Sequence, residues 1–78
     1  MSGQSWSITL DGTEYTRIFD VLLLRSELPT LTYSLHLRYI ATPEKPRSEI
    51  LHGTPDHMWD LFDQCKAAGI PCEYANID

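Results

Sequence analysis

The sequence has few of the residues that build disulfide, metal or cofactor sites. Its two cysteines are too few for a disulfide scaffold, and no Cys-x-x-Cys pair or histidine knuckle gives them a zinc-binding spacing. The four glycines never cluster, which excludes a glycine-rich phosphate loop. The longest apolar stretch, Val21–Leu24, is far shorter than the roughly 20 residues that cross a bilayer. We therefore expect no cofactor, no metal and no membrane segment.

Candidate catalytic residues are also scarce. Lys66 is the only cation near Cys65 or Cys72, and we expect it to point outward, so neither thiol has a base that would activate it. The nearby His52 and His57 do not complete a zinc-binding pattern. His36 alternates with leucines, so we expect it on the solvent side of a strand. We predict that the protein is not an enzyme.

Bases are scarce in the last thirty residues, which carry the whole net charge of −5. Residues 1–48 hold five acids and five bases, whereas residues 49–78 hold six acids and one base, Lys66. Binding to phosphate backbones needs clustered Lys and Arg, so this distribution argues against direct contact with nucleic acid. It permits binding to a basic surface.

The length and composition predict one globular domain spanning residues 1–78. Its residues are 42% hydrophobic and 22% charged, which is typical of a folded chain. A domain this small gains stability from self-association, so a homodimer remains open. The first six residues lack the pattern of a signal peptide, and we expect the reducing cytoplasm as location.

The N-terminal part predicts a β-hairpin. Trp6, Ile8 and Leu10 alternate with serine and threonine, and Asp11-Gly12 is a strong signal for a type I′ turn. Pairing across this turn sets Leu10 opposite Thr13, Ile8 opposite Tyr15 and Trp6 opposite Arg17.

The same alternation continues along the second strand and brings Phe19, Val21 and Leu23 to the face of Ile8. It predicts one long, bent or bulged strand over Thr13–Arg25. A helix over Thr16–Leu28 is the competing interpretation, although its apolar residues would spread over most of the helix circumference.

The rest of the chain predicts two more strands, a helix and a last strand. Leu31–Tyr39 alternates clearly, Thr42–Ser48 contains two prolines and predicts a loop, and Glu49–His52 is compatible with a short strand.

Thr54 and Pro55 predict a helix start, and Gly69 predicts its end. Between them an apolar stripe recurs at helical spacing: Met58, Leu61, Phe62, Cys65 and Ala68. Ile70–Ala75 then predicts the final strand. The predicted fold class is α+β: an antiparallel β-meander of four to five strands with one amphipathic helix packed on one face.

The predicted helix also carries three acids, Asp56, Asp60 and Asp63, at spacings that place them on one face, roughly 5–6 Å apart between neighbours. Trp59 lies beside them at the edge of the apolar stripe. One interpretation is a solvated helix face with a tryptophan at its rim. The other is a docking surface for a basic partner, with Trp59 as anchor and Glu73 adding charge.

In length, acidity, lack of site motifs and this Asp56-Trp59-Asp60-Asp63 face, the chain resembles small acidic inhibitors encoded by phages and mobile elements, anti-CRISPR proteins in particular. The resemblance implies binding to a Cas subunit that stops recognition of target DNA. Lysine or arginine of the partner would then pair with the three aspartates of this face and with Glu73, and Trp59 would fill a pocket. The alternative function is a small accessory subunit or dimerisation module that binds through the apolar sheet face left uncovered by the helix.

Overall fold

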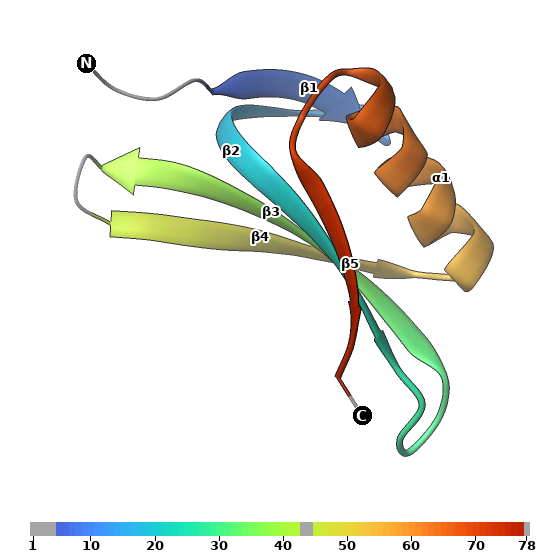
Figure 1. The fold of residues 1–78 in the computed structure, drawn as a ribbon. Helices are drawn as coiled ribbons and strands as arrows, with labels where there is room; N and C mark the ends of the chain where they lie inside the picture. The colour runs from blue at the N-terminus through green and yellow to red at the C-terminus, as the bar shows by residue number, and fades with distance from the viewer. Residues whose placement is uncertain (1–4, 43–44, 78) are drawn as a thin grey trace.

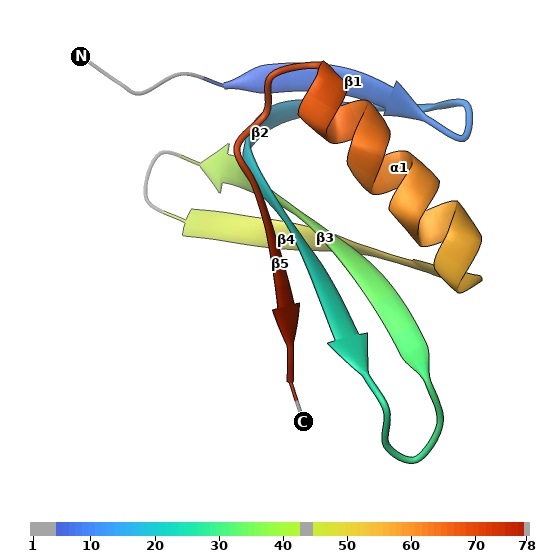
Figure 2. The same ribbon diagram turned by 45° about the vertical axis from the view of Figure 1, so that its right-hand side comes forward.

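The computed structural model describes residues 5–42 and 45–77. In these residues the elements follow in the order β1 (Trp6–Leu10), β2 (Thr13–Ser26), β3 (Thr32–Thr42), β4 (Lys45–Gly53), α1 (Pro55–Ala67) and β5 (Cys72–Asn76). The strands form one sheet, and α1 packs against one of its faces (Figures 1 and 2). The predicted α+β fold, a meander with a single helix, is confirmed.

The long strand β2 lies between β3 on one edge and two shorter strands on the other. Its first part pairs with β1, and Val21–Arg25 pairs with β5. The strands β1 to β4 are antiparallel in sequence order, whereas β5 runs parallel to β2. This direction follows from the chain path, because α1 returns the chain to the end of the sheet at which β4 began.

Two irregularities bend β2. The predicted pairs of Leu10 with Thr13 and of Ile8 with Tyr15 are confirmed, but Trp6 pairs with Ile18 and not with Arg17. Arg17 is an extra residue with φ of 61°, the left-handed conformation found in a β-bulge. The bulge shifts the alternation by one residue, so that Ile18 enters the core.

A second register shift lies between Ile18 and Asp20. It restores the predicted alternation, and both Val21 and Leu23 are buried. The prediction for Phe19 is wrong: it does not join the core, and its ring centroid lies 5.9 Å from the guanidinium carbon of Arg38. The single strand predicted over this segment is confirmed, and the competing helix is wrong.

The loop predicted over Thr42–Ser48 is longer than the one in the structure. β4 begins at Lys45, so the expected short strand Glu49–His52 is the second half of a longer one, and Pro46 pairs with Ile40. Proline is tolerated there because β4 forms an edge of the sheet, where one side of the strand needs no backbone donor. Pro43 and Glu44, also in the predicted loop, lie outside the described residues.

The helix begins and ends where its sequence predicts. The Oγ1 atom of Thr54 accepts a hydrogen bond from the backbone N–H of His57 at 3.2 Å, and Pro55 occupies the first helical position. Gly69, with φ of 88°, follows the helix C-cap in the left-handed conformation that glycine adopts without steric cost.

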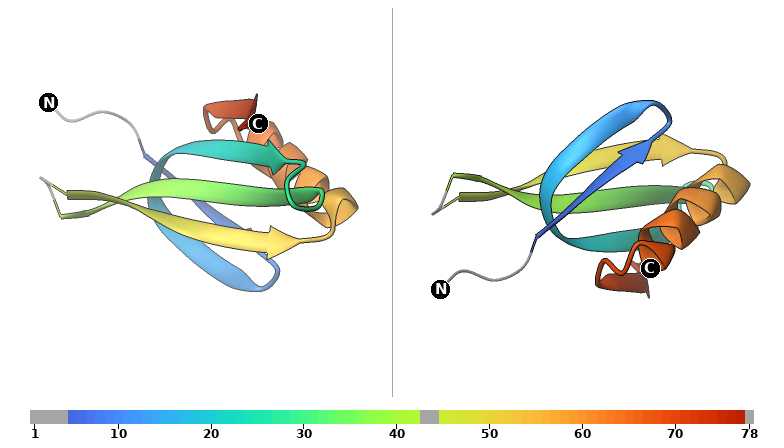
Figure 3. Two further views of the ribbon diagram at one scale, coloured as in Figure 1. Left: turned by 90° about the horizontal axis from the view of Figure 1, so that it is seen from below. Right: turned by 90° about the horizontal axis from the view of Figure 1, so that it is seen from above.

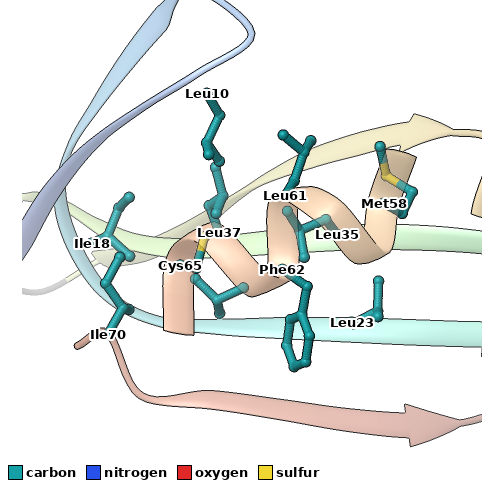
Figure 4. Close-up of a cluster of buried hydrophobic side chains, with 11 residues drawn as sticks. Leu10, Ile18, Leu23, Leu35, Leu37, Met58, Leu61, Phe62, Cys65 and Ile70 are labelled. Carbon is teal, nitrogen blue, oxygen red and sulfur yellow. The ribbon is translucent and has the colours of Figure 1, made fainter. Parts of the chain in front are cut away.

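The core lies between α1, the β1–β2 hairpin and one face of the sheet (Figure 4). It consists of apolar side chains from all of these elements: Leu10, Ile18, Val21, Leu23, Leu35, Leu37, Met58, Leu61, Phe62, Cys65 and Ile70. We call the sheet face beneath α1 the covered face and the opposite one the outer face. Figure 3 shows α1 on one side of strands β2, β3 and β4, and no other described segment lies across the outer face.

Candidate partner-binding surface

The surface of α1 that points away from the sheet carries the three acids predicted to share one face. Asp56, Asp60 and Asp63 are all exposed, and we call them the acidic helix face. Their direction follows from the buried stripe on the other side of α1, because the apolar contacts of the stripe fix the rotation of the helix about its axis.

Weak polar contacts surround these carboxylates. The Nε2 atom of Gln64 donates to an Oδ2 atom of Asp60 at 3.0 Å, and the Nζ atom of Lys66 lies 4.0 Å from Oδ1 of Asp63. Exposed pairs of this kind contribute little to stability. Like charges four residues apart, as in Asp56 and Asp60, are slightly destabilising. Asp60 and Asp63 therefore contribute little to holding the fold together, whereas Asp56 lies in the first turn of α1, where a negative charge favours the helix.

Trp59 lies next to these acids, but its ring already has partners within the chain. The Trp59 ring centroid is 6.0 Å from that of Tyr33, 5.6 Å from that of Phe62 and 5.0 Å from that of Tyr74. We call these four residues the aromatic cluster. Trp59 is half-buried, and Tyr74 is 42% exposed. The cluster joins α1 to β3 and β5, and its exposed edge borders the acidic helix face.

The hydroxyl group of Tyr33 ties this cluster to β2. A hydrogen bond from Trp59 is the main cause that lowers the pKa of Tyr33, and a hydrogen bond from Arg25 adds to it. The Nε atom of Arg25 donates to this hydroxyl at 3.2 Å, and the same guanidinium forms an ion pair with Glu27. The Tyr33 hydroxyl, the polar group of this cluster, therefore already has hydrogen-bond partners within the chain.

Glu73 lies on the other side of the molecule. Because side chains alternate along β5 and Tyr74 contacts Trp59 on the covered face, Glu73 belongs to the outer face. On that face two nitrogens of Arg38 donate to the carboxylate of Asp20. These hydrogen bonds, together with the negative charges of Asp20 and Glu73, raise the pKa of Arg38. The structure therefore brings the three aspartates and Trp59 together and separates Glu73 from them.

The cysteines lie at the boundary between α1 and β5. Cys65 is fully buried, and burial raises the pKa of its thiol to about 12. The Sγ atom of half-buried Cys72 donates to the carbonyl oxygen of Ile70 at 3.1 Å. In residues 5–42 and 45–77 no three side chains of His, Cys, Asp or Glu converge as metal ligands. Within the same residues, no helix has both the length and the apolar character needed to cross a membrane.

Two side-chain contacts of the structure do not follow from the sequence. The aromatic cluster joins residues from three elements, and its members share a face only because β5 pairs with β2 in the observed register. The second contact is between the Nε2 atom of His57 and the Oδ2 atom of Asp11, which lie 2.7 Å apart. Asp11 lies in the turn between β1 and β2 and His57 in the first turn of α1, and no local sequence pattern relates the two.

Comparisons with protein-family models, with curated proteins and with solved structures found no match to this chain.

Proposed function

We propose that this chain is a non-catalytic inhibitor that binds a larger protein complex through the acidic helix face. The partner presents a basic surface that otherwise holds nucleic acid. A surface that binds phosphate backbones must be positively charged, and it would therefore attract these carboxylates. The resemblance to anti-CRISPR proteins makes a CRISPR effector subunit the first candidate, with recognition of its target DNA as the step that is blocked.

The exposure of all three carboxylates on one side of α1 carries this proposal. The opposite side of the helix makes the core contacts, so these acids are available to a partner without any change in the fold. Acidic patches steer association with basic surfaces and raise its rate. Trp59 and Tyr74 border the patch and provide apolar contact area of the kind that dominates binding energy.

The test is charge reversal at two of the acids, Asp60→Lys together with Asp63→Lys. Lysine has a higher helix propensity than aspartate and, at position 60, faces Asp56 one turn earlier with the favourable charge order. The double variant should therefore fold as well as the wild type. We expect it to lose binding to a purified type I or type II effector complex and to lose inhibition of target DNA binding, both measured by gel shift.

The matched control is Glu14→Lys together with Glu49→Lys, which changes the net charge equally at two exposed strand positions. Retained inhibition in this control and its loss in the helix variant would locate the binding surface on α1. Equal loss in both variants would reduce the effect to net charge. Full inhibition by the helix variant would overturn the proposal.

A further inference from the structure

The outer face of the sheet combines apolar and titratable side chains with nothing described above them. Cross-strand pairing aligns Leu22 with His36 and Ile50, and Leu24 with Ser34 and His52. Leu22 and Leu24 are half-buried, and Ile50 is 46% exposed. Ile77, 62% exposed, extends this surface beyond β5, because its N–H continues the ladder by donating to the carbonyl oxygen of Arg25. An apolar surface of this kind is typical of a protein contact.

We propose that two copies of this chain associate face to face through their outer faces, related by a two-fold axis that runs along the strands.

The charges of the outer face support a second copy as the occupant. Glu73 on β5 is the acid at one edge of this face, since Asp20 on β2 is paired with Arg38, whereas the imidazoles of His36 on β3 and His52 on β4 lie toward the other edge. A two-fold axis along the strands sets β5 of one copy over β4 of the other. It thereby places the acidic side of each face against the histidine side of its partner, and a contact of this type closes as a dimer.

The balance of charge points to the same surface. Most of the negative charge of the chain lies on other surfaces, above all on α1, where two copies would repel one another. On the outer face the ion pair between Arg38 and Asp20 is internally neutral, and Glu73 on β5 lies across the face from His36 and His52. This is therefore the apolar surface on which two copies can meet without opposing large charges of the same sign.

The size of the outer face is sufficient for a weak dimer. Pairing of β2 with β3 is continuous from Asp20 with Arg38 to Ser26 with Thr32. With β4 and β5 alongside, strand spacings give a patch of roughly 20 by 23 Å on each copy. Because the side chains make the accessible surface larger than this flat area, two copies would bury about 1,200 Å² between them. This area is at the lower end for specific interfaces, and we expect micromolar affinity.

Such a dimer leaves both acidic helix faces on the outside, pointing in opposite directions, and would allow one dimer to bind two partner molecules. The dimer does not depend on the function proposed above, because the two surfaces lie on opposite sides of the sheet. Either one can fail without the other.

The first experiment is sedimentation equilibrium of the purified chain from about 1 μM to about 1 mM, the range in which an interface of this size dissociates. Ile50→Lys buries a charge in the proposed interface, and Leu31→Lys is its control. Leu31 is 48% exposed and lies at the β2–β3 turn, outside the outer face. We expect reversible dimers for the wild type and for Leu31→Lys. The dissociation constant of the dimer should be at least about tenfold higher for Ile50→Lys than for the wild type.

A charge exchange tests the direction of the axis. Glu73→Lys should weaken the dimer by opposing a lysine to the partner's histidines, and adding His52→Glu should restore it. A wild type that stays monomeric at the highest concentration would overturn the proposal and leave the outer face to a different protein. Dimers that are insensitive to Ile50→Lys would overturn it as well, and failure of the exchange to restore association would exclude this axis.

Discussion

The two faces of the sheet are made from alternate residues of the same strands, yet their chemistry differs sharply. On the covered face, neighbouring positions of β2 and β3 are fully buried leucines and a valine beneath α1. On the outer face, the positions between them hold leucine, histidine, serine and an Arg–Asp ion pair, all only partly buried. The covered face therefore specifies the fold through its buried side chains, whereas the outer face remains partly exposed to solvent.

The largest expected effect separates these two faces through one matched pair of variants. Leu35→Ala removes a fully buried side chain opposite Leu23 and should lower the free energy of unfolding by about 3 kcal/mol. Leu24→Ala, on the outer face of the neighbouring strand, should lower it by less than about 1 kcal/mol, since a half-buried leucine leaves no sealed cavity. Urea denaturation at low protein concentration measures both. Equal losses would contradict the division into a covered and an outer face.

The cysteines test burial without mutation. Cys65 is fully buried under α1 and its pKa is raised to about 12, whereas Cys72 is half-buried on β5 with a smaller rise caused by burial. A thiol reacts as its thiolate, so iodoacetamide at pH 8 should label Cys72 well before Cys65 in the native protein. In denaturant the two rates should become similar. Mass spectrometry of the labelled peptides would show the order, and prior labelling of Cys65 would contradict the packing of α1.

The bulge in β2 decides which side chains of this strand reach the covered face. Arg17 holds a positive φ that an arginine adopts at a cost, so Arg17→Gly should raise the free energy of unfolding by up to about 1 kcal/mol. Arg17→Val, a β-branched residue that disfavours this conformation, should lower it. If thermal denaturation shows that glycine destabilises and valine stabilises, β2 continues without the bulge and the predicted pairing of Trp6 with Arg17 is restored.

The smallest expected effect is a dependence on pH that originates on the outer face. Burial, with smaller contributions from the charges of His52 and Arg38, lowers the pKa of His36 below its usual 6.5, and Ser34 contacts its Nε2 atom at 3.0 Å. The unfolded chain therefore binds this proton more readily than the folded one. The stability due to His36 is complete above pH 6.5 and is lost as the pH falls below that value. His36→Gln should flatten the decline in melting temperature between pH 7 and pH 5, about the range over which an unperturbed histidine titrates.

Much of the fold follows from local sequence signals. The Asp11-Gly12 turn, the alternation in β3 and the start and end of α1 each depend on residues within a few positions of one another. The direction of the acidic helix face follows from the same helical spacing. The alternation predicts a bent or bulged strand, but the position of the bulge at Arg17 did not follow, because no glycine marks the left-handed position. The start of β4 at Lys45 did not follow either, because Pro46 and the proline before it favour a loop when read without the neighbouring strand.

Local signals in the sequence account for the kind and order of the elements and for most of the alternation between the two faces, because periodicity and end signals act over a few residues. The exceptions are Ile18 and Phe19, where the irregularities of β2 change which side chain is buried. Only the tertiary structure decided which elements meet. Pairing of β5 with β2 in parallel brings Tyr74 to Trp59 and carries Glu73 to the outer face, away from the aspartates with which it was grouped. Such contacts depend on the register between distant strands. A shift of one residue there exchanges the two faces, and no local pattern records it.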